Sequence, residues 1–452
     1  MKKLLYISVL VIISIPGFLG ITCLYEESPM HGDISKNELY LPQDFCWDIW
    51  FSGLYQYEIE RSASAGTGAR GILARIVNQI NFFILRTNGN KHVVVGKNNY
   101  LYEKGYITAY TGKNFCGEYF ISRSVAEFRK LQKLLKEKYN TDLILVFEPG
   151  KAGTFPENIP EYEKLYSAGN NNYSEFIKQC NQQDLQALDL QNYFLMLKDS
   201  SDYPLFSPYG VHWTTYGMYL ATDTILAYIR NKTGRNVADI NITDLQITDT
   251  TKDVDFDLEK TMNLYSDLPH VNFAFPVIRW DTAGKERPKV LTIADSYYWS
   301  LYNNKVPEMA FSNKEYWYYY KTIYPYVWLD NPKWIKDIDR EAVYLDQDII
   351  LFMITEMNLH RAFWGFTDEL LDQFDTTRIK DPLFETMKYI LNDELFYPII
   401  IEKTSEWSCS FELALNKMSS FIINLREHPE SKQAKDFWSA YRKLKRIKGL
   451  VY

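Results

Sequence analysis

The chain has 452 residues, of which 46% are hydrophobic and 24% are charged, and these values are typical of a folded globular protein. The composition excludes an intrinsically disordered protein, and the length predicts two or three structural units. Fifty basic residues against 57 acidic ones give a net charge of -7. No long basic run is present, so we expect no nucleic-acid partner. Aromatic residues make up 16% of the chain, and we expect most of them in the core.

An uncharged run from Leu4 to Tyr25 opens the chain, with two lysines directly before it and two glutamates directly after it. A helix needs about 20 apolar residues to cross a bilayer, and this charge asymmetry places the N-terminus in the cytoplasm. No small-x-small cleavage site ends the run. We therefore predict an uncleaved transmembrane signal anchor over residues 1–25. A cleaved signal peptide is the alternative.

Beyond the anchor the chain has four cysteines, Cys46, Cys116, Cys180 and Cys409. In an oxidising compartment they could form two disulfides in any of three connectivities, and four unpaired thiols are an equal alternative. Their spacing matches no metal-binding motif, so we predict no metal site.

After the predicted anchor, the chain contains a polar stretch, then a helical pattern, and then two short strands. Residues 26–45 are polar and indicate a tether, and residues 47–87 have a helical pattern that glycines interrupt near position 70. Two short strands are then predicted, over residues 92–96 and 100–102, around an Asn-Asn turn.

An α/β pattern follows. An amphipathic helix is predicted from about residue 124 to residue 139, and it leads into a continuous apolar strand over residues 142–147. Two further apolar strands are predicted over residues 290–294 and 349–354. Such strands are typical of a largely parallel sheet that helices cover on both faces. Polar residues end each strand, and the carboxyl ends of parallel strands commonly hold the ligand. From about residue 378 the chain indicates a small helical region.

Two segments carry residues suited to acyl chemistry. Ser296 follows a predicted strand in the sequence Ala-Asp-Ser-Tyr, where backbone N–H groups can hold an oxyanion. A helix cap is the alternative interpretation of this serine. His212 precedes a helical pattern beside Trp213, and a serine nucleophile needs such a base. The alternative interpretation of His212 is a core histidine whose ring nitrogens form structural hydrogen bonds.

Together these segments resemble the SGNH-hydrolase-like domain of the alginate O-acetyltransferase family. In that family a His-Trp motif precedes the serine motif, the reverse of ordinary SGNH esterases, and His212 precedes Ser296 here. The segments that carry the resemblance are Gly96–Tyr102, Val146–Lys151, Gly210–Trp213 and Ala294–Tyr297. The resemblance implies an α/β, SGNH-hydrolase-like fold with a permuted motif order.

By position, the resemblance implies Ser296 as nucleophile and His212 as general base, with Asp295 as part of the serine motif. Four further side chains are predicted to contact the oxyanion or the substrate, namely Tyr297, Lys151, Trp213 and Trp317.

The expected acid of a catalytic triad is missing. The family carries an aspartate two residues before the histidine, and this chain has Gly210 there. We predict that Glu356, at the end of a predicted strand, substitutes for it, and Glu148 is a second candidate. A Ser-His dyad that acts without an acid would also fit this sequence, and so would an inactive site.

The predicted domains are residues 1–25 as anchor, 26–89 as tether and helical region, 90–375 as acetyltransferase domain and 376–452 as C-terminal helical region. The resemblance implies an O-acetyltransferase that modifies an exported polysaccharide through an acetyl-serine intermediate. It also implies a bacterial inner-membrane location with the catalytic domain in the periplasm, and a membrane-bound O-acyltransferase as acetyl donor. No coenzyme site is predicted. A carbohydrate esterase and a catalytically impaired polysaccharide-binding scaffold are the alternative functions.

Overall fold

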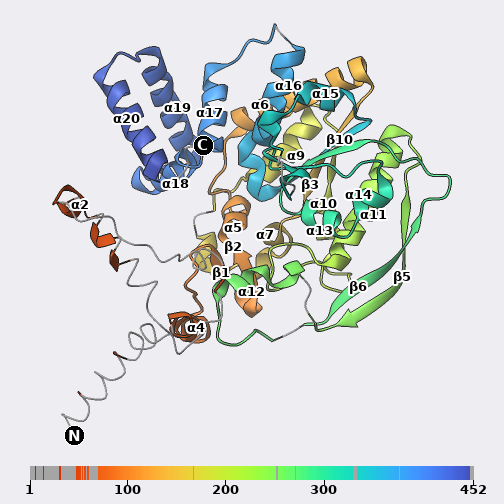
Figure 1. Ribbon diagram of the computed structural model, residues 1–452, viewed down its shortest axis with the longest axis horizontal. Helices are drawn as coiled ribbons and strands as arrows, with labels where there is room; N and C mark the ends of the chain where they lie inside the picture. Colours follow the sequence, from red (N-terminus) through yellow and green to blue (C-terminus); the bar gives the residue numbers. More distant parts are fainter. Residues whose placement is uncertain are drawn as a thin grey trace. The chain divides into compact units, whose positions relative to one another are not determined.

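The computed structural model describes most of the chain from residue 70 onward (Figure 1). The described residues are 6, 14, 30–31, 47–51, 53, 55–57, 59–60 and 70–447, without 166, 251–252, 270, 329–332 and 376. Two compact units are present. The smaller unit comprises residues 1–104, 208–211 and 251–271, and the larger unit comprises residues 105–207, 212–250 and 272–452.

The larger unit is built on a six-stranded sheet with the order β4-β3-β10-β7-β8-β9. Its strands are β3 (Asp142–Glu148), β4 (Ala187–Asp189), β7 (Val290–Ala294), β8 (Tyr316–Tyr318), β9 (Thr322–Tyr324) and β10 (Ile349–Thr355). All neighbours pair in parallel except β8 and β9, which form an antiparallel hairpin. The three predicted apolar strands are confirmed as β3, β7 and β10, and they lie side by side. A largely parallel α/β sheet is therefore confirmed, with one antiparallel edge.

Helices cover both faces of this sheet, because every residue of the three central strands is buried (Figure 1). Alternate side chains of β3 and β10, among them Leu145 and Phe352, pack with the apolar faces of several helices. The principal helices are α6 (Glu118–Tyr139), α7 (Lys151–Thr154), α9 (Asn172–Gln182), α10 (Leu190–Leu197), α11 (Thr215–Thr233), α13 (Tyr298–Asn303), α14 (Val306–Ala310), α15 (Arg340–Leu345) and α16 (Phe366–Phe374). The helix predicted from residue 124 is α6, and it begins earlier, at Glu118, where an acidic residue suits the helix dipole.

A charged helical region ends the chain, as predicted. It contains α17 (Pro382–Asn392), α18 (Phe396–Glu406), α19 (Phe411–Glu427) and α20 (Lys432–Ile447). Asp381 caps α17 by accepting from the backbone of Leu383 and Phe384, and Ser410 caps α19. The larger unit also carries a long antiparallel ribbon of β5 (Asp239–Thr248) and β6 (Phe273–Asp281) (Figure 1).

The smaller unit contains the predicted hairpin, here β1 (Val93–Val95) and β2 (Leu101–Glu103), which pair antiparallel. Asn98 and Asn99 have positive φ angles in the turn, a conformation that asparagine tolerates. The predicted helical segment before it contains α2 (Trp47–Phe51), α4 (Arg70–Ile80) and the π-helical segment η2 (Asn81–Leu85). Helix α12 (Asp257–Met262) also belongs to this unit.

The predicted anchor over residues 1–25 lies outside the described residues, apart from Tyr6 and Ser14. Within the part of the chain that the structure describes, no helix has both the length and the apolar character needed to cross a bilayer. Cys116, Cys180 and Cys409 are free thiols, and burial raises the pKa of the Cys180 thiol to about 12.

Candidate active site

The two residues proposed for acyl transfer lie together. Ser296 follows β7 directly, and His212 lies shortly before α11. Although 84 positions separate them in the chain, His212 Nε2 is 3.0 Å from Ser296 Oγ. This is the contact that a general base needs in order to take the hydroxyl proton. Both side chains are half-buried.

Aromatic rings fix the position of the imidazole. The centroid of the buried Tyr297 ring lies 4.8 Å from that of His212 and 5.3 Å from that of Trp213. Trp213 is fully buried, and its Nε1–H donates to Ser300 Oγ, whose own hydroxyl donates to the carbonyl of Tyr297. Thr214 then caps α11 by accepting from the backbone of Gly217. Tyr297 and Trp213 thus lie beside the base and position it.

Asp295 ties the end of β7 to the end of β10. Its Oδ2 accepts from the backbone N–H of Thr355 at 2.9 Å, from Thr355 Oγ1 at 2.7 Å and from Asn358 Nδ2 at 2.8 Å. Its Oδ1 accepts from the N–H of Tyr297 at 3.2 Å. Four donors satisfy this buried carboxylate, which therefore holds the loop that presents Ser296.

A second carboxyl group lies beside Asp295. Glu148 ends β3, pairs in register with Thr355, and is buried. Neither of its oxygens accepts from a donor among the described residues. Burial first, and then the neighbouring Asp295 carboxylate, raise the pKa of Glu148 well above its usual value. These surroundings therefore favour the neutral form of the Glu148 carboxyl group.

Tyr319 is a site residue that the sequence analysis did not identify. It lies in the turn between β8 and β9, and its backbone N–H donates to the carbonyl of Ala294, next to the serine motif. Burial first, and then the neighbouring Asp295 carboxylate, raise the pKa of the Tyr319 hydroxyl, whereas the nearby side chains of Ser296 and Asn358 act in the opposite direction. The phenol therefore stays protonated at neutral pH and can act as a hydrogen-bond donor near Ser296.

The turn that carries Tyr319 is strained. Tyr319 and Tyr320 have φ angles of 50° and 53°, which bulky residues rarely adopt. Trp364 packs edge-on against Tyr319, and it belongs to a second left-handed stretch, from Ala362 to Gly365. Backbone strain of this kind persists where the surrounding packing imposes it, and it is common at functional sites.

One backbone donor at the serine has no hydrogen-bond partner in the part of the chain that the structure describes, namely the N–H of Ser296. The N–H of Tyr297 donates to Asp295 and is not available for an oxyanion. The Ser296 N–H and the Tyr319 hydroxyl are therefore candidate donors to an oxyanion at Ser296.

Glu356 lies at the end of β10 and is buried against the segment that begins α7. Its Oε1 accepts from the N–H of Gly153 at 3.2 Å, and a side chain on Gly150 would collide with its carboxyl group. Burial raises the pKa of Glu356 to about 8, so the group is mostly neutral at pH 7. An acid that orients a catalytic histidine acts in its ionised form, so the predicted orienting role requires a pH above neutrality.

The remaining predicted site residues differ in placement. Lys151 is buried as the first residue of α7. Trp317 is fully buried in the core, where its Nε1–H donates to Glu315 and its ring packs on Tyr344. This position favours core packing over contact with a substrate. Gly210 is not among the described glycines with a positive φ angle, so its backbone does not require glycine.

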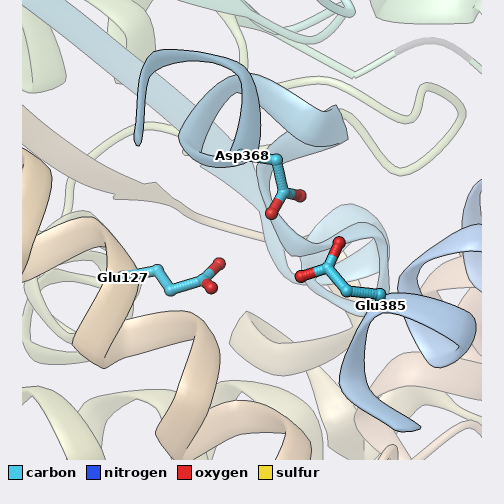
Figure 2. A group of neighbouring side chains, drawn as sticks. All are labelled: Glu127, Asp368 and Glu385. Atoms are coloured by element: carbon cyan, nitrogen blue, oxygen red, sulfur yellow. The ribbon is translucent and has the colours of Figure 1, made fainter. Parts of the chain in front are cut away.

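A cluster of three carboxylates lies apart from the predicted active-site residues. Figure 2 shows the side chains of Glu127, Asp368 and Glu385, which approach one another from α6, α16 and α17. Two cations already occupy this group: Arg378 lies 2.8 Å from Asp368, and Lys388 lies 2.8 Å from Glu385. Arg378 and Lys388 also pair with Glu127. We interpret the group as an ion-pair network that fixes α17 to the sheet domain.

A family model matches the part of the chain that contains His212. Residues 93–271 match the family model described as an SGNH hydrolase-like domain, acetyltransferase AlgX. The predicted resemblance is confirmed. The matched domain is that of an acyltransferase, as predicted, and it includes His212, whereas Ser296 lies beyond it. No curated protein matches the chain.

Three solved structures are similar to the chain at low identity. The O-acetyltransferase domain of Pseudomonas putida AlgJ is 14% identical, covers 61% of this chain and 99% of its own, and has a TM-score of 0.40. Pseudomonas aeruginosa AlgX is 14% identical, covers 62% and 67%, and has a TM-score of 0.39. Bacillus cereus PatB1 with a sulfonyl adduct is 14% identical, covers 54% and 91%, and has a TM-score of 0.33.

Proposed function

We propose that the protein moves acetyl groups onto hydroxyls of an exported polysaccharide through an acetyl-serine intermediate. The observation that carries this proposal is the 3.0 Å contact between His212 Nε2 and Ser296 Oγ at the carboxyl end of the sheet. The family match of residues 93–271 supports acetyl transfer.

The first half-reaction loads the serine. Ser296 Oγ attacks the acetyl carbonyl carbon while His212 Nε2 takes the hydroxyl proton. The Ser296 N–H and the Tyr319 hydroxyl stabilise the oxyanion. When the intermediate collapses, the bond to the leaving group breaks, and the leaving group receives the proton from His212.

The second half-reaction unloads the serine. A sugar hydroxyl attacks the acetyl ester, and His212 takes its proton. The ester bond to Ser296 then breaks, and His212 returns the proton to Ser296 Oγ. Water in place of the sugar hydroxyl would make the protein an esterase, so the acceptor alone distinguishes these two functions.

A mass-spectrometric experiment tests the intermediate. After brief incubation with a chromogenic acetyl ester, the peptide that contains Ser296 should carry one acetyl group, and Ser296→Ala should lose both the adduct and the ester hydrolysis. Ser312→Ala, which removes an exposed serine hydroxyl outside the site, is the matched control. Equal hydrolysis by the wild type and Ser296→Ala would exclude this mechanism. In that case the chain would be a scaffold.

A second assay separates transferase from esterase. With an acetyl ester as donor and a polysaccharide as acceptor, a transferase increases the acetate bound to polymer, whereas an esterase releases free acetate only. Ser296→Ala should abolish the polymer-bound product.

The location and the donor form part of the same proposal. The uncharged run of residues 4–25, with lysines before it and glutamates after it, supports an anchor in the inner membrane and a periplasmic catalytic domain. Cytoplasmic acetyl-CoA is out of reach there, which supports a membrane-bound O-acyltransferase as donor. N-terminal sequencing of the mature protein tests the anchor, because cleavage near residue 25 would exclude it.

A further inference from the structure

Helix α4 and the η2 segment of the smaller unit expose most of their apolar side chains to solvent. In a surface helix of a globular protein, the apolar side chains normally face the core and the polar ones face water. Here seven apolar side chains are between 40% and 72% exposed, namely Leu73, Ile76, Val77, Ile80, Phe83, Ile84 and Leu85. The spacing of the first four along α4 places them on one face, and the last three continue the exposed apolar surface along η2.

The opposite, more polar face holds the helix in place. Asn78 is buried, and its Nδ2 donates to the carbonyl of Met262 at 2.7 Å. Gln79 Oε1 accepts from the backbone N–H groups of Tyr265 and Ser266, each at 2.9 Å. Phe82 is the buried apolar contact on this side. Because these hydrogen bonds fix the rotation of the helix about its axis, the apolar face is held outward.

The chain segment that carries this face has charged residues of one sign only. From residue 61 to residue 102 the chain has six basic residues and no acidic one, although the whole chain has a net charge of -7. Arg86 and Lys91 are exposed just beyond the helix. Arg86 donates to Asn99 Oδ1 at 2.9 Å and lies over the Phe82 ring, and among the described residues no carboxylate pairs with it. Apolar side chains flanked by basic residues are what an anionic lipid surface attracts.

We propose that α4 and η2 lie on an anionic membrane surface, with the apolar face from Leu73 to Leu85 inserted among the lipids. The helix lies parallel to the membrane, so this contact is separate from the predicted spanning anchor. It is also independent of acetyl transfer at Ser296.

Photo-crosslinking from single positions in the full chain tests this. The chain is reconstituted in vesicles of phosphatidylcholine with or without phosphatidylglycerol. Phe83→p-benzoylphenylalanine places the photo-reactive probe on the apolar face, and Tyr265→p-benzoylphenylalanine is the matched control. Both positions are 62% exposed and lie in the same unit. We expect about tenfold more lipid adduct from position 83, with the larger yield in the vesicles that contain phosphatidylglycerol.

A charge reversal completes the test. Arg86→Glu combined with Lys91→Glu should lower the adduct at position 83 in the anionic vesicles and leave ester hydrolysis unchanged. Equal lipid adducts at positions 83 and 265 would overturn the proposal, as would a yield that does not depend on phosphatidylglycerol. An adduct between two copies of the chain at position 83 would also overturn it and identify a dimer interface instead.

Discussion

Asp295 Oδ2 accepts two hydrogen bonds from a single residue, one from the backbone N–H of Thr355 and one from its hydroxyl. Asp295 directly follows β7, and Thr355 ends the adjacent parallel strand β10. This pair therefore connects the strand that presents Ser296 to its neighbour in the sheet.

A matched pair of substitutions measures that connection. Thr355→Val keeps the shape and removes the hydroxyl, and a lost hydrogen bond to a charged group costs about 1.5–3 kcal/mol. Thr355→Ser keeps the hydroxyl and should cost less. Urea unfolding compares the two variants, and equal losses of stability would show that the hydroxyl contributes nothing.

Tyr319→Phe should lower the turnover of an acetyl ester by about 100- to 1,000-fold with little change in stability, because it removes an oxyanion donor. Tyr320→Phe is the control from the same turn. The Tyr320 hydroxyl faces Tyr344 and Glu369, so its removal should lower stability and spare turnover. Similar turnover in both variants would refute the role of Tyr319.

Glu356 should make stability fall as the pH rises. Its folded-state pKa of about 8 lies above the ordinary value of 4.5, so between these values the unfolded chain releases a proton that the folded chain keeps. Each pH unit in this range costs the folded state up to about 1.4 kcal/mol. Glu356→Gln lacks this cost, so its stability relative to the wild type should grow by a few kcal/mol between pH 5 and pH 8. Unfolding midpoints at the two pH values provide the measurement, and parallel pH profiles would contradict it.

The same variant tests the orienting role. If ionised Glu356 orients His212, turnover of the wild type should rise as the pH passes through about 8, and Glu356→Gln should lack that rise. Loss of an orienting carboxylate can lower turnover by about four orders of magnitude. If Glu356→Gln and the wild type have equal turnover at every pH, His212 acts in a dyad without an acid or is oriented by an acid other than Glu356.

The ion-pair network between α6, α16 and α17 should contribute strongly to stability. Arg378 is almost fully buried, so Arg378→Met leaves carboxylates without their cation and should cost about 3–5 kcal/mol. Lys130→Met, which breaks a pair with Asp375 through a half-exposed lysine, should cost less than about 1 kcal/mol. Chelation by EDTA should leave the unfolding midpoint unchanged, because Arg378 and Lys388 supply the positive charge.

The sheet and the pairing of Ser296 with His212 could be predicted from the sequence. Continuous apolar runs specify buried parallel strands, and the order of the two motifs indicated which residues meet. Tyr319 could not be found in this way, because the aromatic run around it favours a strand, whereas its position depends on a left-handed turn. Trp317 was predicted as a substrate contact because neighbouring aromatic residues look alike in sequence, and burial alone distinguishes them.

The free thiols bear on how the protein can be produced. Cys116 and Cys180 are buried in the core, and Cys409 is half-buried and unpaired. The described part of the fold therefore needs no oxidase or disulfide isomerase, and it should form equally well under reducing conditions. Buried thiols with raised pKa values react slowly with alkylating reagents while the chain is folded. The rate at which a reagent alkylates these thiols would therefore report the opening of the sheet domain.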